Sequence, residues 1–268
     1  IVTLSNGIKF QLPLFEELYR ELIAIKSRKY HQRKLKMADL PPSLPFANVI
    51  RVEHLGFYYP GTSEDVLTDV SFLIPKGSFV GIVGPSGAGK TTFVDILLGL
   101  FVPTRGRITV DGVDIRHQLR AWQANIAYVP QSIYLIDATI RENVALGEST
   151  DEIDDVRVHK ALVMAELDQF VNALPHGIET TVGERGVKLS GGQRQRIGIA
   201  RALYQQPEVL ILDEATSALD TETEKNITST IMKFKGQITI IAIAHRISTL
   251  AECDFRVRFE NGKAKILL

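Results

Sequence analysis

The strongest constraint on the fold is a glycine-rich octapeptide, GPSGAGKT, at residues 84–91. An apolar run at residues 78–83 precedes it, and a helical pattern at residues 90–101 follows it. Glycines let the backbone turn closely, so that successive N–H groups and the start of the helix face one point. The motif G-x-x-x-x-G-K-[ST] between a strand and a helix therefore predicts a loop that binds the phosphates of a nucleotide.

Each residue type in this loop suits a task in phosphate binding. We expect the Lys90 ammonium to reach the β and γ phosphates and the Thr91 hydroxyl to face Mg²⁺. The predicted nucleotide-binding residues of this segment are Gly84, Pro85, Ser86, Gly87, Ala88, Gly89, Lys90, Thr91 and Thr92.

From residue 48 onward, short β-type runs alternate with helical ones, which is typical of an α/β domain with a largely parallel sheet. The apolar runs at residues 209–212 and 238–244 are rich in β-branched side chains, as in central strands covered on both faces. Residues 137–174 are mostly helical and polar, which indicates an inserted helical subdomain.

Composition narrows the class of protein only a little. The 268 residues are 45% hydrophobic, which suits a globular protein with a substantial core. Basic and acidic residues number 31 each, so charge does not favour nucleic acid as the main partner. Cys253 is the single cysteine, which excludes an intrachain disulfide framework.

A second motif, LSGGQ at residues 189–193, decides among the many classes of phosphate-binding protein. It resembles the signature sequence of the ABC ATPase family, as does the basic helical segment that follows it. Ser190 can cap that helix, and the N–H groups after it offer a second anion site for a γ phosphate. The residues predicted for this second site are Ser190, Gly191, Gly192 and Gln193.

A third motif is the apolar run at residues 209–212 followed by Asp213 and Glu214, which resembles the Walker B segment of the same family. We expect Asp213 to hold Mg²⁺ through its water shell. Glu214 would polarise the water that attacks the γ phosphate.

Further residues match the family by order and spacing. The resemblance implies that Gln131 is the Q-loop glutamine, that Asp220 ends the D-loop and that His245 is the switch histidine. Tyr59 resembles the aromatic residue that stacks on adenine, with its neighbour Tyr58 as the competing choice. The predicted catalytic residues are Glu214, His245, Lys90 and Gln131, and the predicted metal-site residues are Thr91, Gln131 and Asp213.

The resemblance also implies an architecture and partners. It predicts a P-loop NTPase core with a mainly parallel sheet, an antiparallel β subdomain and a helical subdomain at about residues 137–205. The cofactors would be ATP and Mg²⁺. Two such domains would close head to tail around ATP, as a homodimer or a heterodimer.

Two features indicate the exporter type. Residues 180–186 resemble the loop that exporters hold against their membrane helices. Residues 10–36 form an amphipathic helical pattern with a basic end, which would be the linker from a transmembrane domain on the same native polypeptide. We therefore expect a linker at residues 1–47 and an ATPase domain at residues 48–268, at the cytoplasmic face of an inner or plasma membrane.

Two other classes of protein share these motifs. Chromosome-type ABC ATPases separate loop and signature by a long coiled coil, whereas Lys90 and Ser190 are only 100 residues apart here. A degenerate nucleotide sensor is disfavoured by the presence of Glu214, His245 and an unaltered LSGGQ. The sequence leaves the transported substrate open.

Overall fold

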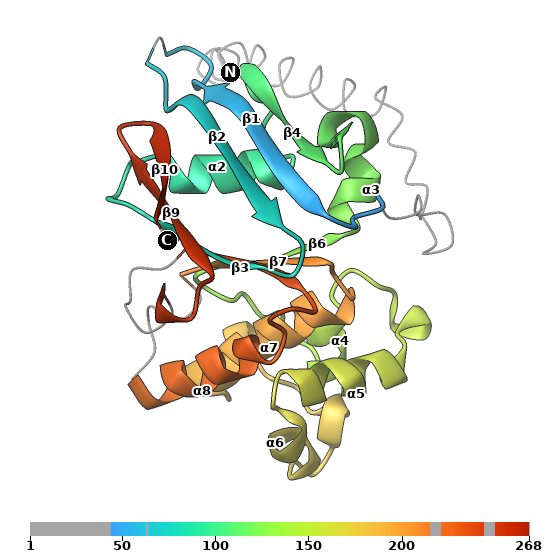
Figure 1. Ribbon diagram of the computed structural model, residues 1–268. Coiled ribbons are helices and arrows are strands. Elements are labelled where there is room, and N and C mark those ends of the chain that lie inside the picture. Colours follow the sequence, from blue (N-terminus) through green and yellow to red (C-terminus); the bar gives the residue numbers. More distant parts are fainter. Residues whose placement is uncertain (1–43, 63, 215–220, 244–249, 268) are drawn as a thin grey trace, which may run out of the picture. The chain divides into compact units, whose positions relative to one another are not determined.

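The computed structural model describes residues 44–62, 64–214, 221–243 and 250–267, all within one compact unit (Figure 1). The helix expected at residues 10–36 lies outside these ranges, as do Asp220 and His245. Within these ranges, no helix is both long and apolar enough to cross a lipid bilayer.

A six-stranded sheet forms the centre, with the strand order β10-β9-β3-β8-β7-β6. All neighbouring strands are parallel except β10, which pairs antiparallel with β9. The predicted mainly parallel sheet is therefore confirmed. The strands are β3 (Phe79–Val83), β6 (Ile126–Val129), β7 (Val209–Asp213), β8 (Thr239–Ile243), β9 (Phe255–Glu260) and β10 (Lys263–Leu267).

Both faces of this sheet are buried, which explains the continuous apolar runs. Along β7, Leu210 packs with the helical part of the domain, whereas Ile211 packs on the opposite face with α2 (Lys90–Leu97). All five residues of β8 are buried. In a strand covered on both faces, every side chain is buried and adds to stability. The alternation of apolar and polar residues that marks half-exposed strands is therefore absent here.

The second sheet is antiparallel, in the order β2-β1-β4-β5, and matches the predicted β subdomain (Figure 1). Helix α2 packs between the two sheets: Phe93 contacts the rings of Phe72 on β2 and Phe259 on β9. The strands are β1 (Val49–Phe57), β2 (Leu67–Pro75), β4 (Arg105–Val110) and β5 (Val113–Asp114).

Most of the remaining helices form the inserted subdomain between β6 and β7, where α4 and α5 pack against α7 (Figure 1). The helices are α3 (Leu119–Gln123), α4 (Ile140–Val144), α5 (Asp155–Met164), α6 (Asp168–Asn172), α7 (Gly191–Tyr204) and α8 (Thr221–Met232). Single turns of 3-10 helix are η2 (Ile115–Gln118), η3 (Thr150–Glu152), η4 (Gly177–Glu179) and η5 (Glu184–Gly186).

The helix after the glycine-rich loop is shorter than expected. The pattern predicts a helix to residue 101, whereas α2 ends at Leu97. Gly99 has a φ of 73°, and a Cβ there would lie 2.2 Å from Leu119 Cδ1. A left-handed glycine ends helices because it turns the chain away from the axis at no steric cost.

The buried core also begins before residue 48. Leu44 and Phe46 are almost fully buried, and the Leu44 N–H donates to the carbonyl of Ala121 at 3.2 Å. These residues pack with the domain that follows them. The boundary between linker and domain at residue 47 stays a prediction.

Candidate nucleotide-binding site

A cavity of about 450 Å³ lies where β7 and β8 end and α2 begins. Carboxyl ends of parallel strands meet at one edge of a sheet, which is where ligands bind in such folds. The cavity therefore brings together the glycine-rich loop, the acidic pair and Tyr59. It is lined by Tyr59, Val66, Ser86, Gly87, Gly89, Lys90, Thr91, Thr92, Asp213, Glu214 and Ile243.

The Lys90 ammonium lies inside the turn of the loop. Its Nζ donates to the carbonyl oxygens of Gly84 and Pro85, at 2.8 Å each, and the residue is only 8% exposed. No carboxylate among the described residues forms an ion pair with it. A buried cation satisfied only by carbonyl dipoles fits an anionic ligand, because such a ligand would neutralise its charge.

Gly84 shows why the loop needs glycine at its start. Its φ is 145°, and a Cβ there would lie 2.1 Å from the carbonyl oxygen of Phe259 on β9. Only glycine allows the loop to pass this close to the neighbouring strand.

Helix α2 begins at the cavity without a side-chain cap. Its N-cap is Gly89, which supplies no acceptor, so the N–H groups of the first turn meet no capping side chain. This is the arrangement that favours phosphate at a helix start. Of the predicted loop residues, Gly84, Pro85 and Ala88 do not line the cavity, and Ala88 is buried in the core.

Among the described residues, Tyr59 is the aromatic side chain that lines the cavity, and Tyr58 does not line it. The Tyr59 ring makes edge contacts with Phe57 and Phe101, with centroids 5.1 and 5.7 Å apart. Its hydroxyl lies 3.0 Å from the Thr92 Oγ1. These contacts hold the ring in place beside the loop, where a base could stack on it.

Asp213 ends β7 and accepts a hydrogen bond from the Tyr128 hydroxyl at 2.8 Å. Burial, and then the negative charge of Asp213, raise the pKa of Asp95 on α2. Burial and the hydrogen bond to Asp213 raise the pKa of Tyr128 well above its ordinary value. Asp213 therefore lies beside one hydroxyl donor and one like charge.

Thr91 and Asp213 offer oxygen atoms to the same cavity, which is the ligand chemistry that Mg²⁺ prefers. Within the described ranges, no Lys or Arg forms an ion pair with Asp213, and no cluster of three His, Cys, Asp or Glu could hold a metal alone. The residues fit an ion that takes its other ligands from phosphate and water.

Glu214 follows Asp213 in a left-handed backbone conformation, with a φ of 46°. Its N–H donates to the carbonyl of Ile243 at 3.0 Å, and its Oε2 accepts from Gln131 Nε2 at 2.8 Å. A non-glycine residue adopts this conformation at a cost, and such residues cluster at functional sites. Gln131 itself does not line the cavity but contacts it through Glu214.

The signature segment lies elsewhere in the chain's structure. The Ser190 Oγ accepts from the Gln193 N–H at 3.2 Å, and the Ser190 N–H donates to Gln193 Oε1 at 2.8 Å. This reciprocal capping box begins α7, so the predicted cap at Ser190 is confirmed. Ser190, Gly191, Gly192 and Gln193 do not line the cavity.

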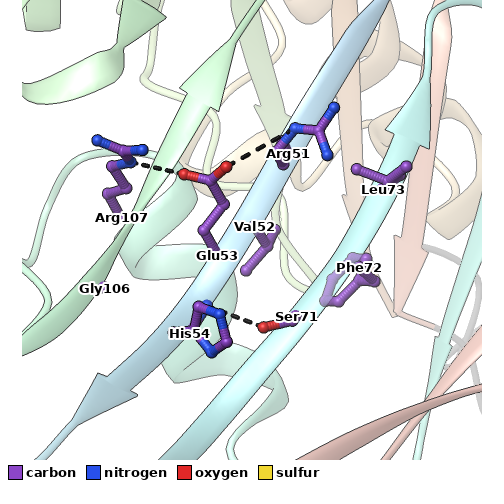
Figure 2. A pocket seen from close by; sticks show the side chains of 9 residues that line it. All are labelled: Arg51, Val52, Glu53, His54, Ser71, Phe72, Leu73, Gly106 and Arg107. Atoms are coloured by element: carbon purple, nitrogen blue, oxygen red, sulfur yellow. Dashed lines mark hydrogen bonds and ion pairs between the residues drawn. The ribbon is translucent and has the colours of Figure 1, made fainter. Parts of the chain in front are cut away.

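A larger hollow, of about 690 Å³, lies on the antiparallel sheet (Figure 2). Glu53 on β1 stands between two arginines there: Arg107 Nε is 2.6 Å from its carboxylate and Arg51 Nε is 3.7 Å away (Figure 2). The opposite charges offset one another within the sheet. Without a glycine-rich loop or a catalytic carboxylate, this hollow is a poorer candidate than the smaller cavity.

Sequence reasoning missed Tyr128 and Asp95. Tyr128 precedes Gln131 by three residues on β6, and no motif marks its hydroxyl. Its contact with Asp213 depends on the pairing of β6 with β7 across more than 80 residues. Asp95 reads from the sequence as one polar residue on an amphipathic helix.

A glycine-rich loop between a strand and a helix, a buried lysine and an acidic strand end together define a nucleoside triphosphate-binding domain of the P-loop class. The family model described as "ABC transporter" matches residues 67–217. The chain belongs to this family, as an ATPase domain of the exporter type.

Relatives agree with this placement. The chain is 44% identical to an ATP-dependent lipid A-core flippase of Cupriavidus pinatubonensis, over 79% of this chain and 36% of that protein. It is 40% identical to a mitochondrial potassium channel ATP-binding subunit of Xenopus tropicalis, over 86% and 35%. The chain thus spans about a third of the length of these relatives.

Among solved structures, the chain is similar to a bacterial Atm1-family ABC exporter with ATP bound. The sequence identity is 41% and the TM-score is 0.74. The match covers 83% of this chain and 39% of that one.

Proposed function

We propose that this domain binds ATP with Mg²⁺ in the 450 Å³ cavity and hydrolyses it to drive transport. The observation that carries the proposal is the meeting of Lys90, Thr91, Asp213 and Glu214 in one cavity. Mg²⁺, when bound, would offset phosphate charge and orient the γ phosphate.

The side chains divide the work. The Lys90 ammonium is directed into the loop, where it bonds the carbonyls of Gly84 and Pro85. On binding, it would exchange these two carbonyls for the β and γ phosphates. Glu214, oriented by the amide of Gln131, would hold and polarise the attacking water. His245, which lies outside the described residues, would offset charge on the γ phosphate.

The active unit is a head-to-tail pair of such domains, either identical or related. In support, Ser190 to Gln193 do not line the cavity of their own chain, so they are available to close the cavity of a second one. Asp220 of the D-loop would lie at the same junction. The partner is thus a second nucleotide-binding domain.

The domain works at the cytoplasmic face of an inner or plasma membrane, joined through residues 1–47 to a transmembrane domain on the same native polypeptide. The loop at residues 180–186 would contact that domain. The transport is export, or flipping of a lipid-like molecule between leaflets. Two similar proteins support this proposal. They are named as a flippase and an exporter, and this chain covers little more than a third of each.

Substitution of Glu214 tests the proposal. Glu214→Gln keeps the shape and the contact with Gln131 but loses the base, so we expect ATP binding to persist and turnover to fall by about a hundredfold or more. Hydrolysis and equilibrium binding are measured on the same preparation. Glu64→Gln, an exposed change away from the cavity, is the matched control. Near-normal hydrolysis by Glu214→Gln would refute the assignment.

A further inference from the structure

We propose that Tyr128 is a positioning residue for the metal site, holding the Asp213 carboxylate through the hydrogen bond from its hydroxyl to Oδ2. The inference rests on the proposed function, because it assigns Asp213 to the Mg²⁺ of bound ATP. The hydrogen bond is 2.8 Å long. It is the one side-chain hydrogen bond that the described residues make with this carboxylate.

The strand register makes this contact possible. β6 and β7 are parallel, and Tyr128 pairs with Ile211, so both side chains point to the face that packs with α2. Asp213 lies two residues beyond Ile211 and returns to the same face. Two residues of strand rise by about 6.6 Å, which a tyrosine side chain leaning along the strand can span.

The charges around Asp213 give the hydroxyl its importance. The carboxylates of Asp95 on α2 and Asp213 repel each other, and no basic side chain of the described residues pairs with Asp213. The Tyr128 hydroxyl is therefore the donor that opposes this repulsion. The hydroxyl engages Oδ2, and no side chain among the described residues bonds Oδ1. Oδ1 would then be the oxygen that meets the ion's water shell.

Removal of the hydroxyl should act on the metal and not on the fold. The residue Tyr128 is 37% exposed, and Tyr128→Phe keeps its whole ring. The carboxylate would then be free to rotate away from Asp95, so ordering it on the ion would cost more. We expect the Mg²⁺ concentration at half-maximal nucleotide binding to rise about fivefold to tenfold.

The experiment titrates Mg²⁺ into the full chain with a fluorescent ATP analogue, and counts bound Mn²⁺ by electron paramagnetic resonance in parallel. The matched control is Tyr134→Phe, which removes a hydroxyl from an exposed ring outside the cavity. We expect Tyr128→Phe to shift the metal midpoint and to leave binding without metal unchanged. An unshifted midpoint in a folded Tyr128→Phe protein overturns the inference.

A double-mutant cycle keeps the test sharp if Tyr128→Phe lowers thermal stability. If the hydroxyl acts through Asp213, Tyr128→Phe should have no further effect on the midpoint in an Asp213→Ala background, which has no side-chain acceptor. Additive effects would overturn the inference. If the unaltered chain binds no ATP at all, the proposed function fails. If it binds and hydrolyses ATP and Tyr128→Phe matches it in every titration, the positioning role alone fails.

Discussion

At the scale of single residues, the phosphate site depends on a buried lysine. Lys90 bonds two carbonyls of its own loop, which holds its ammonium at the mouth of α2. Lys90→Ala should therefore weaken ATP binding itself, by about tenfold or more, since charge-assisted hydrogen bonds to phosphate are lost. An equilibrium titration with a fluorescent ATP analogue checks this. Lys265→Ala, an exposed change, should bind as the unaltered chain does.

A second residue-scale prediction concerns acid stability. The Asp114 carboxylate is 7% exposed and accepts from the Arg116 guanidinium at 2.6 to 3.1 Å, which lowers its pKa below 3.8 although burial opposes the shift. A carboxylate with a lowered pKa stabilises the fold at pH values above its ordinary pKa of 3.8. This contribution to the free energy of unfolding is lost as the pH falls below 3.8.

Asp114→Asn should thus cost about 1–3 kcal/mol at pH 7. The cost should shrink as the pH falls below 3.8 toward the lowered pKa of Asp114, because the unfolded chain then takes up a proton that the folded carboxylate still excludes. Urea unfolding at several pH values measures the difference. A gap that stays constant to pH 3 would contradict the ion-pair explanation, and Asp151→Asn serves as an exposed control.

At the scale of elements, α7 is fixed to the segment that follows Gln131. A Cβ on Gly198 would lie 2.4 Å from Ile133 Cδ1 and 2.7 Å from its Cγ1. Arg201, one turn later, donates to the Tyr134 carbonyl at 3.0 Å. A change in the signature helix should therefore displace the chain next to the contact between Gln131 and Glu214.

Gly198→Ala tests this connection. Alanine favours a helix by about 1 kcal/mol over glycine, but overpacking against Ile133 costs about 1–3 kcal/mol. We expect a net loss of stability and slower hydrolysis. Ile133→Ala in the same chain should restore both toward the level of Ile133→Ala alone. Strictly additive losses in the double variant would show that the two side chains do not compete for space.

At the scale of the whole molecule, the proposed site is divided between two chains. Lys90→Ala disables the loop and Ser190→Arg blocks the signature, so each variant alone should be inactive at both sites of a homodimer. Mixing the two variants at high concentration should restore some hydrolysis, because one of the two mixed sites combines an intact Lys90 with an intact Ser190. Hydrolysis rates before and after mixing measure the gain.

The control for this mixture is crosslinking, which confirms that mixed dimers form. If mixed dimers are present and hydrolysis does not exceed the sum of the separate variants, the head-to-tail model fails. Ser190 would then act only as the N-cap of α7, through the hydrogen bond that its Oγ accepts from the Gln193 N–H.

Much of the fold and the candidate site could be read from local patterns. The loop, the strand that ends at Asp213 and the capped helix after Ser190 each lie within about a dozen consecutive residues. Glycine torsions, capping and apolar runs act over that distance, so the sequence shows them directly. The predicted end of α2 at residue 101 is wrong, because the left-handed turn at Gly99 depends on packing against Leu119. The catalytic roles stay predictions.

By itself, the sequence determined that the chain is an α/β domain with a phosphate-binding loop, because the motif contains the backbone freedom and charge that the task requires. Only the tertiary structure decided that Gln131 contacts Glu214, that Tyr128 contacts Asp213 and that Tyr59 lines the cavity. Those contacts join segments dozens of residues apart. They follow from strand order and register, which long-range packing sets and no local pattern encodes.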